Sequence, residues 1–319
     1  MQESSFSKDI HKGATSLALL LCVAYMLSFA AAFFWFFDIL RHFIFQYLVG
    51  ASVLGTYFLI QQSKRYALIM GLIVLSTGCE IYFSTPKAPL NTDPANLKVA
   101  LFNKLFYTPN SQEILKWIAI EKPDILVIQE ADPDMLRHVQ NLRDYPYLHH
   151  AILTNPFGFL MLSRYPLENA SVGYTQEYVI NNIYGHVVME LSNEISVSVY
   201  AAHPVPPVSG KHSKQRNTDI KIMSEKINAD KSTNVILLGD FNITPYSPYF
   251  KDLLRATALK NEYSSYLPVP SWPSAYIDYI FQIPIDHILH KGDLQLIEKR
   301  RGPAMGSDHY PLIATYAIQ

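Results

Sequence analysis

The residues best suited to chemistry follow a short apolar run in the second half of the chain. Val235 to Leu238 are continuously apolar and stop at Gly239, a pattern typical of a strand buried on both faces. Asp240 and Asn242 come directly afterwards, before prolines that prevent the strand from continuing. Because alternate residues of an extended chain point the same way, we expect this carboxylate and this amide to face one cleft. The simpler alternative is that they cap a turn.

Polar side chains also mark the ends of five other predicted strands. These strands cover residues 97–102, 125–128, 195–201, 285–289 and 311–317. The side chains are Asn103, Glu130, His203, Asp286, and Asp308 with His309. Taken singly, each could be an ordinary loop or turn residue. Their repeated position at strand ends favours a shared site.

The chemistry of this set indicates a hard divalent cation. Carboxylates, amides and imidazoles without cysteine suit Mg²⁺ or Mn²⁺ better than a structural zinc site. Such an ion neutralises phosphate charge and helps to position a water for in-line attack. The two cysteines, Cys22 and Cys79, fall inside apolar segments near the N-terminus, so the rest of the chain has no disulfide framework.

The remaining elements alternate between helices and strands. Helical spacing covers residues 111–120, 134–142, 216–228 and 247–258, and further strands are expected at 158–163, 185–191 and 277–281. The ring-rich stretch 145–150 is expected to be a loop. His149, His150 and His186 have no strand-end setting, and we interpret them as ordinary histidines.

The first 84 residues predict a membrane region with three transmembrane helices, at about 16–37, 43–60 and 66–83. The first of these segments has 22 residues without a charge, enough to cross a hydrocarbon core. A cleaved signal peptide is the alternative for this segment, but its apolar run is long and two more follow. Residues 85–96 are rich in Pro, Asn and Thr, and we expect them to be a linker to a domain over 97–319.

The distribution of basic residues predicts the orientation of this region. Lys8 and Lys12 precede the first span, and Lys64 and Arg65 lie between the second and third. By the positive-inside rule the N-terminus should be cytoplasmic, and three crossings place the domain on the other side. In a bacterium this predicts an inner-membrane protein with a periplasmic domain.

The charge balance argues against a dedicated nucleic-acid binder. From residue 88 onward the chain carries 20 Lys and Arg residues against 23 Asp and Glu residues. A protein that binds nucleic acid mainly through its backbone phosphates needs a basic surface instead.

As a set, these motifs resemble the endonuclease/exonuclease/phosphatase family, which includes relatives of DNase I and exonuclease III. The matching pieces occur in the family's order over residues 97 to 319. They are Asn103, the QE of Gln129 and Glu130, the HP at His203, the GDFN of Gly239 to Asn242, an IDxI segment and the SDH of Ser307 to His309. The HPVPP at His203, Arg216, the PIDHIL around Asp286 and the preceding apolar helices are similar to a membrane-anchored bacterial branch of YafD-type proteins.

The resemblance implies a fold. It is an α/β four-layer sandwich, with two mixed sheets packed face to face and helices outside, here preceded by the three-helix membrane region.

The resemblance also implies a role for each matching residue. Glu130, Asn103 and Asp308 would hold the metal ion. Asp240 would orient or deprotonate the attacking water, and Asn242 would donate to the charge developing on phosphorus. His309 would contact the scissile phosphate, with its ring held by an aspartate. The substrate-binding residues would be Asn103, Asn242, His203 and Arg216, with His203 also a candidate proton donor.

Two aspartates compete to hold His309. Asp286 lies 22 residues before Asp308 and Asp278 lies 30 residues before it. The shorter gap and the PIDH context favour Asp286.

These residues favour a membrane-anchored, metal-dependent phosphoesterase. Its substrate would be a phospholipid head group, a nucleotide or sugar phosphate, or nucleic acid, and its other partner the lipid bilayer. No protein partner can be inferred from the sequence. The alternatives are a nuclease and a catalytically silent membrane receptor or scaffold.

Overall fold

The computed structural model describes residues 5–89, 96–108, 110–175, 182–192, 194–274 and 279–318. The chain divides into two compact units. One contains the chain up to Ser84 together with Tyr246–Pro248, and the other contains Thr85–Pro245 and the chain from Tyr249 onward.

The N-terminal unit consists of four helices, α1 (Ser5–Ser28), α2 (Trp35–Arg41), α3 (Ile44–Ile60) and α4 (Lys64–Ser84). The break after Ser28 differs from the single span expected over residues 16–37. Backbone N–H groups of Phe29, Ala30 and Ala31 donate to carbonyls three residues earlier, which closes the helix with tight turns. Hydropathy did not reveal the break because both of its flanks are equally apolar.

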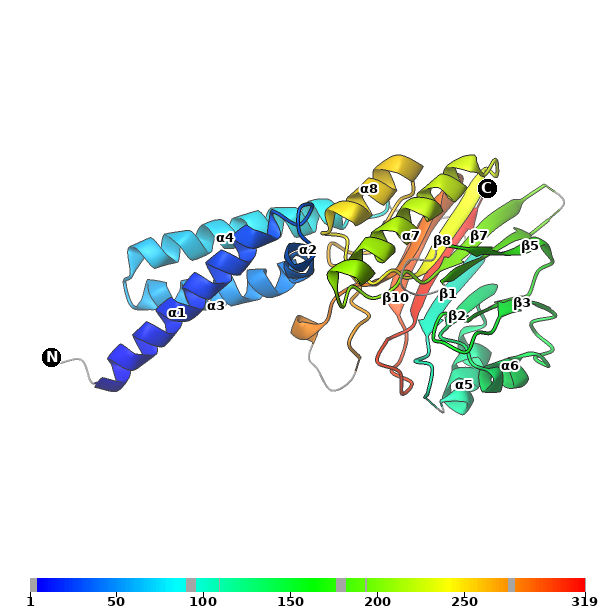
Figure 1. Ribbon diagram of the computed structural model, residues 1–319, viewed down its shortest axis with the longest axis horizontal. Coiled ribbons are helices and arrows are strands. Elements are labelled where there is room, and N and C mark those ends of the chain that lie inside the picture. The colour runs from blue at the N-terminus through cyan, green and yellow to red at the C-terminus, as the bar shows by residue number, and fades with distance from the viewer. Residues whose placement is uncertain are drawn as a thin grey trace. The chain divides into compact units, whose positions relative to one another are not determined.

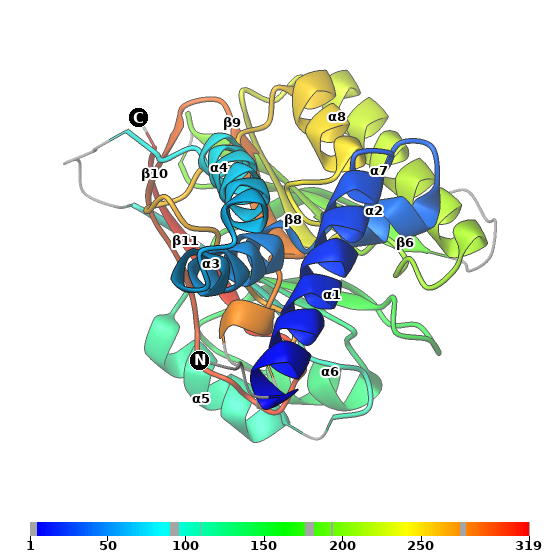
Figure 2. The same ribbon diagram turned by 90° about the vertical axis from the view of Figure 1, so that its left-hand side faces the viewer.

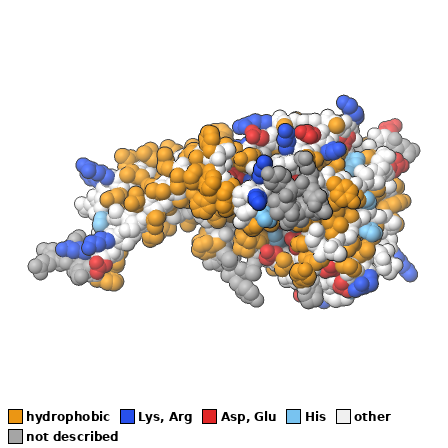
Figure 3. Space-filling view, viewed as in Figure 1, with side chains coloured by type: hydrophobic (Ala, Val, Ile, Leu, Met, Phe, Trp, Pro, Cys, Tyr) orange, Lys and Arg blue, Asp and Glu red, His pale blue; other side chains and the backbone are white. Residues whose placement is uncertain are grey.

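Two of these helices could cross a membrane by length and composition, namely Lys8–Ser28 and Lys64–Ser84. The pair α2 and α3, bent by 61°, would make a third span if the two helices cross as one. Figure 3 shows that apolar side chains dominate the visible surface of the N-terminal helices. A stable, water-exposed helix normally shows one apolar stripe, so this surface is typical of helices that contact lipid.

The larger unit is built on two mixed β-sheets (Figure 1). The first sheet has the order β10-β11-β1-β2-β4-β3 and the second β5-β6-β7-β8-β9. Each sheet has one parallel pair, β1 with β2 and β7 with β8, and antiparallel neighbours elsewhere. The strands of the first sheet are β1 (Leu97–Asn103), β2 (Ile125–Gln129), β3 (Tyr147–Ala151), β4 (Phe159–Ser163), β10 (Leu294–Arg301) and β11 (Leu312–Ile318). Those of the second are β5 (Leu167–Tyr174), β6 (Ile183–Glu190), β7 (Ser196–Ala202), β8 (Asn234–Asp240) and β9 (Asp286–Lys291).

Four helices cover the outer faces of the two sheets, as Figure 2 shows. They are α5 (Ser111–Glu121) and α6 (Pro133–Val139) on the first sheet, and α7 (Gly210–Ala229) and α8 (Pro248–Thr257) on the second. One apolar core lies between the sheets and includes Val99, Val127, Val199 and Ile236. Two further cores lie under the helices. This is the four-layer α/β sandwich that the family resemblance implied, preceded by helices with two or three candidate spans.

The strands that the sequence did not predict, β3, β5 and β10, are all edge strands. Their side chains are largely half-buried or exposed, so they show no clear apolar alternation. The expected loop at 145–150 therefore contains β3. The strand expected at 277–281 is wrong over its described part, because Tyr279–Phe281 form a short 3₁₀ helix, η1.

Candidate active site

The two parallel strand pairs bring their carboxyl ends to one place in the sandwich. In each pair a helix connects the strands, α5 between β1 and β2 and α7 between β7 and β8. Parallel neighbours end at the same edge of a sheet. Asn103 and Glu130 therefore come from the first sheet, and His203 and Asp240 come from the second.

Gln129 joins the two sheets at this edge. Its Nε2 donates to the carbonyl of Ala202 at 2.8 Å, and its Oε1 accepts from the backbone N–H of Asp240 at 2.7 Å. A side chain on Gly239 would not fit this arrangement, because its Cβ would lie 1.8 Å from the Ala202 oxygen. The glycine before Asp240 thus permits the close approach that sets the position of the carboxylate.

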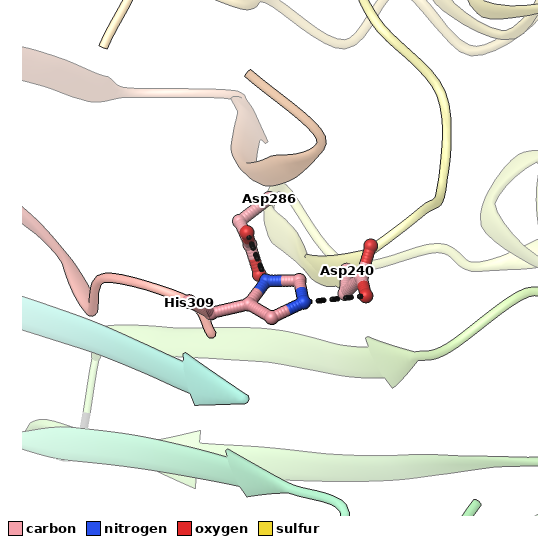
Figure 4. Close-up of side chains that lie close together, drawn as sticks. All are labelled: Asp240, Asp286 and His309. Carbon is pink, nitrogen blue, oxygen red and sulfur yellow. Dashed lines mark hydrogen bonds and ion pairs between the residues drawn. The ribbon is translucent and has the colours of Figure 1, made fainter. Parts of the chain in front are cut away.

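His309 lies between two buried aspartates (Figure 4). Its Nδ1 is 2.8 Å from Asp286 Oδ2, and its Nε2 is 3.6 Å from Asp240 Oδ2. Asp286 begins β9 and is paired in register with Asp240 of β8. Ser307 positions the histidine loop, since its Oγ donates to the Asn103 carbonyl at 2.7 Å and accepts from the His309 N–H.

The two carboxylates keep His309 protonated. Burial alone would lower the pKa of His309, but the charges of Asp286 and Asp240 raise it to about 10. In return His309 and His203 hold the pKa of Asp240 below its usual value, against the effect of burial. The trio could in principle ligate a metal. At neutral pH a cation there would have to displace the imidazolium proton.

Asp240 Oδ2 also faces a second histidine and an amide. His203 Nε2 lies 3.4 Å away and Asn103 Nδ2 donates at 3.2 Å. Burial alone would lower the pKa of His203, but the hydrogen bond to Asp240 and the nearby carboxylate charges raise it. Three nitrogen groups therefore converge on one carboxylate oxygen. The other oxygen, Oδ1, accepts from the backbone N–H of Asn242 and caps the turn.

Glu130 is a partly exposed carboxylate of the site. It has a positive φ of 54°, which is uncommon for a residue other than glycine and occurs often at functional sites. Its Oε2 accepts from the Phe106 N–H at 2.9 Å and its Oε1 from Asn103 Nδ2 at 3.0 Å. These contacts fix the carboxylate in one orientation.

Asp308 contributes a carboxylate oxygen without a hydrogen bond. Trp272 Nε1 donates to its Oδ2 at 3.0 Å, whereas its Oδ1 is buried and has no hydrogen-bond partner among the described residues. This oxygen lies 4.0 Å from His309 Nε2. A buried carboxylate oxygen without a hydrogen bond is the kind of hard donor that Mg²⁺ or Mn²⁺ prefers.

Asn242 does not continue the strand, so the extended geometry expected for residues 240 to 242 is wrong. Its φ is 51°, and its side-chain Nδ2 donates to the Pro204 carbonyl at 3.0 Å. Asp240 therefore caps the turn with its Oδ1 and faces the other site residues with its Oδ2.

Arg216 is not brought into the open part of the site. Its side chain is fully buried, and NH1 donates to the Asn242 carbonyl at 3.3 Å. It supports the turn that carries Asn242, which does not match a direct contact with substrate. Asp278, the alternative partner of His309, lies outside the described residues.

Several residues that support the site went unnoticed in the sequence. Lys104 is fully buried and binds Asp132 at 2.6 Å, which holds the chain after β1. Asn182 Nδ2 donates to the His203 carbonyl at 2.7 Å and to Asp219 at 3.1 Å. The available sequence signal for Lys104 was its position directly after Asn103, at the end of a buried strand. The partners of Asn182 come from distant parts of the chain.

Known proteins share this fold. The profile described as the Endonuclease/Exonuclease/phosphatase family matches residues 96–309. No curated protein matches the sequence.

Three solved structures illustrate the likeness. One is an endonuclease/exonuclease/phosphatase family protein from Leptotrichia buccalis, with 14% identity, a TM-score of 0.55, and coverage of 70% of this chain and 100% of that one. The second is the endonuclease/exonuclease/phosphatase from Bacteroides vulgatus, with 15% identity, a TM-score of 0.59, and coverage of 70% and 99%. The third is truncated Caenorhabditis elegans TDP2, with 15% identity, a TM-score of 0.57, and coverage of 69% and 97%. At such identities the likeness shows a common fold.

Proposed function

Because this chain belongs to the endonuclease/exonuclease/phosphatase family, we propose that it is a membrane-anchored phosphoesterase that depends on a divalent metal. The observation that carries the proposal is the convergence of His203, His309 and Asn103 on one oxygen of Asp240, next to Glu130. Hydrolysis of a phosphomonoester or phosphodiester needs donors to the phosphate and an oriented water. This group of residues can supply both.

The metal site would consist of Glu130, Asn103 and Asp308. A bound Mg²⁺ or Mn²⁺ would neutralise phosphate charge during the reaction. The orientation of Glu130 by Phe106 N–H and the unsatisfied Oδ1 of Asp308 support this assignment.

The buried charges suggest how the other residues act. Asp240, with its low pKa, is a weak base, so it would orient the attacking water more than deprotonate it. His309 carries a proton that it can donate to a phosphate oxygen or to the leaving group, while Asp286 holds the ring. His203 would be the second donor. Arg216 would keep the Asn242 turn in place.

The N-terminal helices would anchor the enzyme in a membrane. Helix α3 has 17 residues and is about 25 Å long, shorter than the ~30 Å hydrocarbon core. Together with α2 it could complete a third crossing. We propose three crossings, a cytoplasmic N-terminus and a periplasmic catalytic domain in a bacterial inner membrane. A reporter that is active only in the cytoplasm, fused after Gln319, should be silent, and an active reporter would overturn this topology.

The decisive experiment offers a panel of phosphoesters to the full-length protein. Phosphomonoesters, phosphodiesters, phospholipids and DNA are tested with Mg²⁺, with Mn²⁺ and with EDTA, alongside Glu130→Ala. We expect metal-dependent hydrolysis that Glu130→Ala abolishes, with DNA a poor substrate because the domain has no basic excess. Glu113→Ala, on helix α5, is the matched control and should leave turnover unchanged. If all substrates remain intact with either metal, the proposal fails and a silent receptor is favoured.

A further inference from the structure

The larger unit, which carries the proposed catalytic site, exposes two short apolar stretches that this site does not use. Tyr266 and Leu267 form one stretch, and Tyr279, Ile280 and Phe281 form the other. Leu267 is 49% exposed and Phe281 is 58% exposed. The Tyr279 hydroxyl donates to the carbonyl of Pro268 at 2.8 Å, which joins the two stretches. We name these five residues the aromatic rim.

The aromatic rim is tied to the chain that leaves the last membrane-span candidate. Helix α4 ends at Ser84, and the Oγ1 of the next residue, Thr85, donates to the Tyr266 carbonyl at 3.1 Å. Two residues later, the Lys87 ammonium lies 5.3 Å from the centre of the Tyr266 ring. Successive Cα atoms are only ~3.8 Å apart, so Thr85 stays close to the end of α4. If α4 crosses a bilayer, Tyr266 must lie near the surface of that bilayer.

The composition of the rim matches a membrane interface. Tyrosines place an apolar ring and a polar hydroxyl at the level of the head groups, while Leu, Ile and Phe reach the acyl region. Two cations border the rim, Lys87 beside Tyr266 and Arg301, whose guanidinium lies 5.6 Å from the Tyr279 ring centre. Basic side chains in this position can bind lipid phosphates while their stems contact apolar groups.

We propose that the aromatic rim inserts into the bilayer interface and holds the active site at the level of the lipid head groups. The occupant of this surface is therefore the membrane in which α4 ends. This inference rests on the proposed membrane anchoring of the chain. It adds a second attachment, one that belongs to the catalytic unit itself.

The segment that carries the rim also forms one wall of the active site. Ile283, two residues after Phe281, pairs with Trp272, whose indole donates to Asp308. Next to Trp272, the Ser271 Oγ accepts from the backbone N–H of Asp286 at 3.2 Å. Two extended residues span about 7 Å, so Phe281 stays close to the pair Trp272 and Ile283. An inserted rim would therefore favour a phosphoester that is carried by a lipid.

Fluorescence in vesicles tests the insertion directly and needs no substrate. Full-length protein with Cys22→Ala and Cys79→Ala receives a single new cysteine, Phe281→Cys, labelled with nitrobenzoxadiazole. In phosphatidylcholine and phosphatidylglycerol vesicles we expect a blue-shifted emission that nitroxide-labelled lipids quench. The matched control is Tyr174→Cys, an exposed residue of β5 at the sheet edge opposite β9. This control should show the emission of a dye in water, and an identical emission from position 281 would overturn the proposal.

Turnover supplies a second readout. The double variant Leu267→Ser and Phe281→Ser should lose roughly tenfold in turnover of a lipid-borne phosphoester in vesicles, since less of the protein keeps its rim inserted. Hydrolysis of a water-soluble phosphoester should remain at the wild-type rate. Equal rates of the variant and the wild type on both substrates would contradict the inference. Quenching at position 281 without hydrolysis of any substrate would refute the proposed activity and leave the insertion standing.

Discussion

Two buried histidine–carboxylate pairs in the larger unit behave in opposite ways. His309 Nδ1 lies 2.8 Å from Asp286 in the active site, and His290 Nε2 lies 3.1 Å from Glu262 in a second polar cluster. Both rings are almost completely removed from water. The two histidines therefore have the same type of partner, similar nitrogen–oxygen distances and similar burial.

The surrounding charges separate the two pairs. Burial lowers the pKa of His290, and the attraction of Glu262 does not overcome it because Lys299 and Lys260 repel the proton. Around His309 a second carboxylate, Asp240, adds to Asp286, and the pKa rises to about 10. A buried histidine thus becomes a permanent cation only where carboxylates outnumber cations around it. The first pair can donate a proton, and the second links a loop to β9.

The largest expected effect comes from Asp286→Asn. This change removes the carboxylate that orients the His309 ring and stabilises its proton, so turnover should fall by about 10³-fold. Initial rates on the best substrate of the panel measure it.

The matched control is Glu262→Gln, the same chemical change at the other pair. It should leave turnover unchanged and alter only stability. If the control loses activity and Asp286→Asn keeps it, the contrast between the two pairs is wrong.

Lys299→Met should change how stability depends on pH. Lys299 is buried, with Nζ donating to Asn261 at 3.1 Å, and burial lowers its pKa from 10.5 to about 7 despite the charge of Glu262. Between these values the unfolded chain holds a proton that the folded chain lacks, so the contribution of Lys299 to stability should rise with pH by up to about 5 kcal/mol.

Methionine cannot bind this proton, so the rise attributable to residue 299 should disappear in the variant. The measurement is the urea midpoint of the β-sheet circular dichroism signal in detergent between pH 7 and 10.5. Parallel curves for wild type and variant would contradict the prediction.

Gln129→Leu should displace Asp240 in the candidate active site without changing the cluster that contains His290 and Glu262. It leaves the Ala202 carbonyl and the Asp240 N–H without their buried partner, which should cost about 2–4 kcal/mol of stability. Turnover should fall as well, because Asp240 loses its fixed position. If the variant keeps the stability and the turnover of the wild type, Gln129 does not position the site.

The smallest effect is expected for Arg255→Ala on helix α8. Arg255 binds Asp252 at 2.9 Å, but both side chains are mostly exposed. Water and salt screen such a pair, so the urea midpoint should correspond to a change below about 0.5 kcal/mol. A larger loss of stability would contradict the view that exposure to water weakens this ion pair.

The interior strands could be predicted from the sequence, whereas most edge strands could not. Strands β2 and β8 are buried on both faces and appear as short apolar runs closed by polar residues. Strands β3, β5 and β10 have one free edge and partly exposed side chains, so backbone pairing defines them more than side-chain pattern does.

The members of the site and the contact of His309 with Asp286 were expected from the sequence, but the other contacts were not. Asp286 was expected to hold the His309 ring, and the structure adds that the other nitrogen of this ring faces Asp240. The left-handed turn at Asn242 and the burial of Arg216 depend on side chains from other elements. Local spacing contains no information about such partners.

The sequence alone determined the apolar N-terminal segments and the residue types of the site, and its resemblance to a known family implied the class of the fold. Apolar runs and polar strand ends are local patterns, and each follows from a few neighbouring residues. The tertiary structure decided which oxygen of Asp240 caps a turn and which meets the histidines. It also decided which buried histidine keeps a proton, because the pKa depends on all charges within a few ångströms, and residues far apart in the chain contribute those charges.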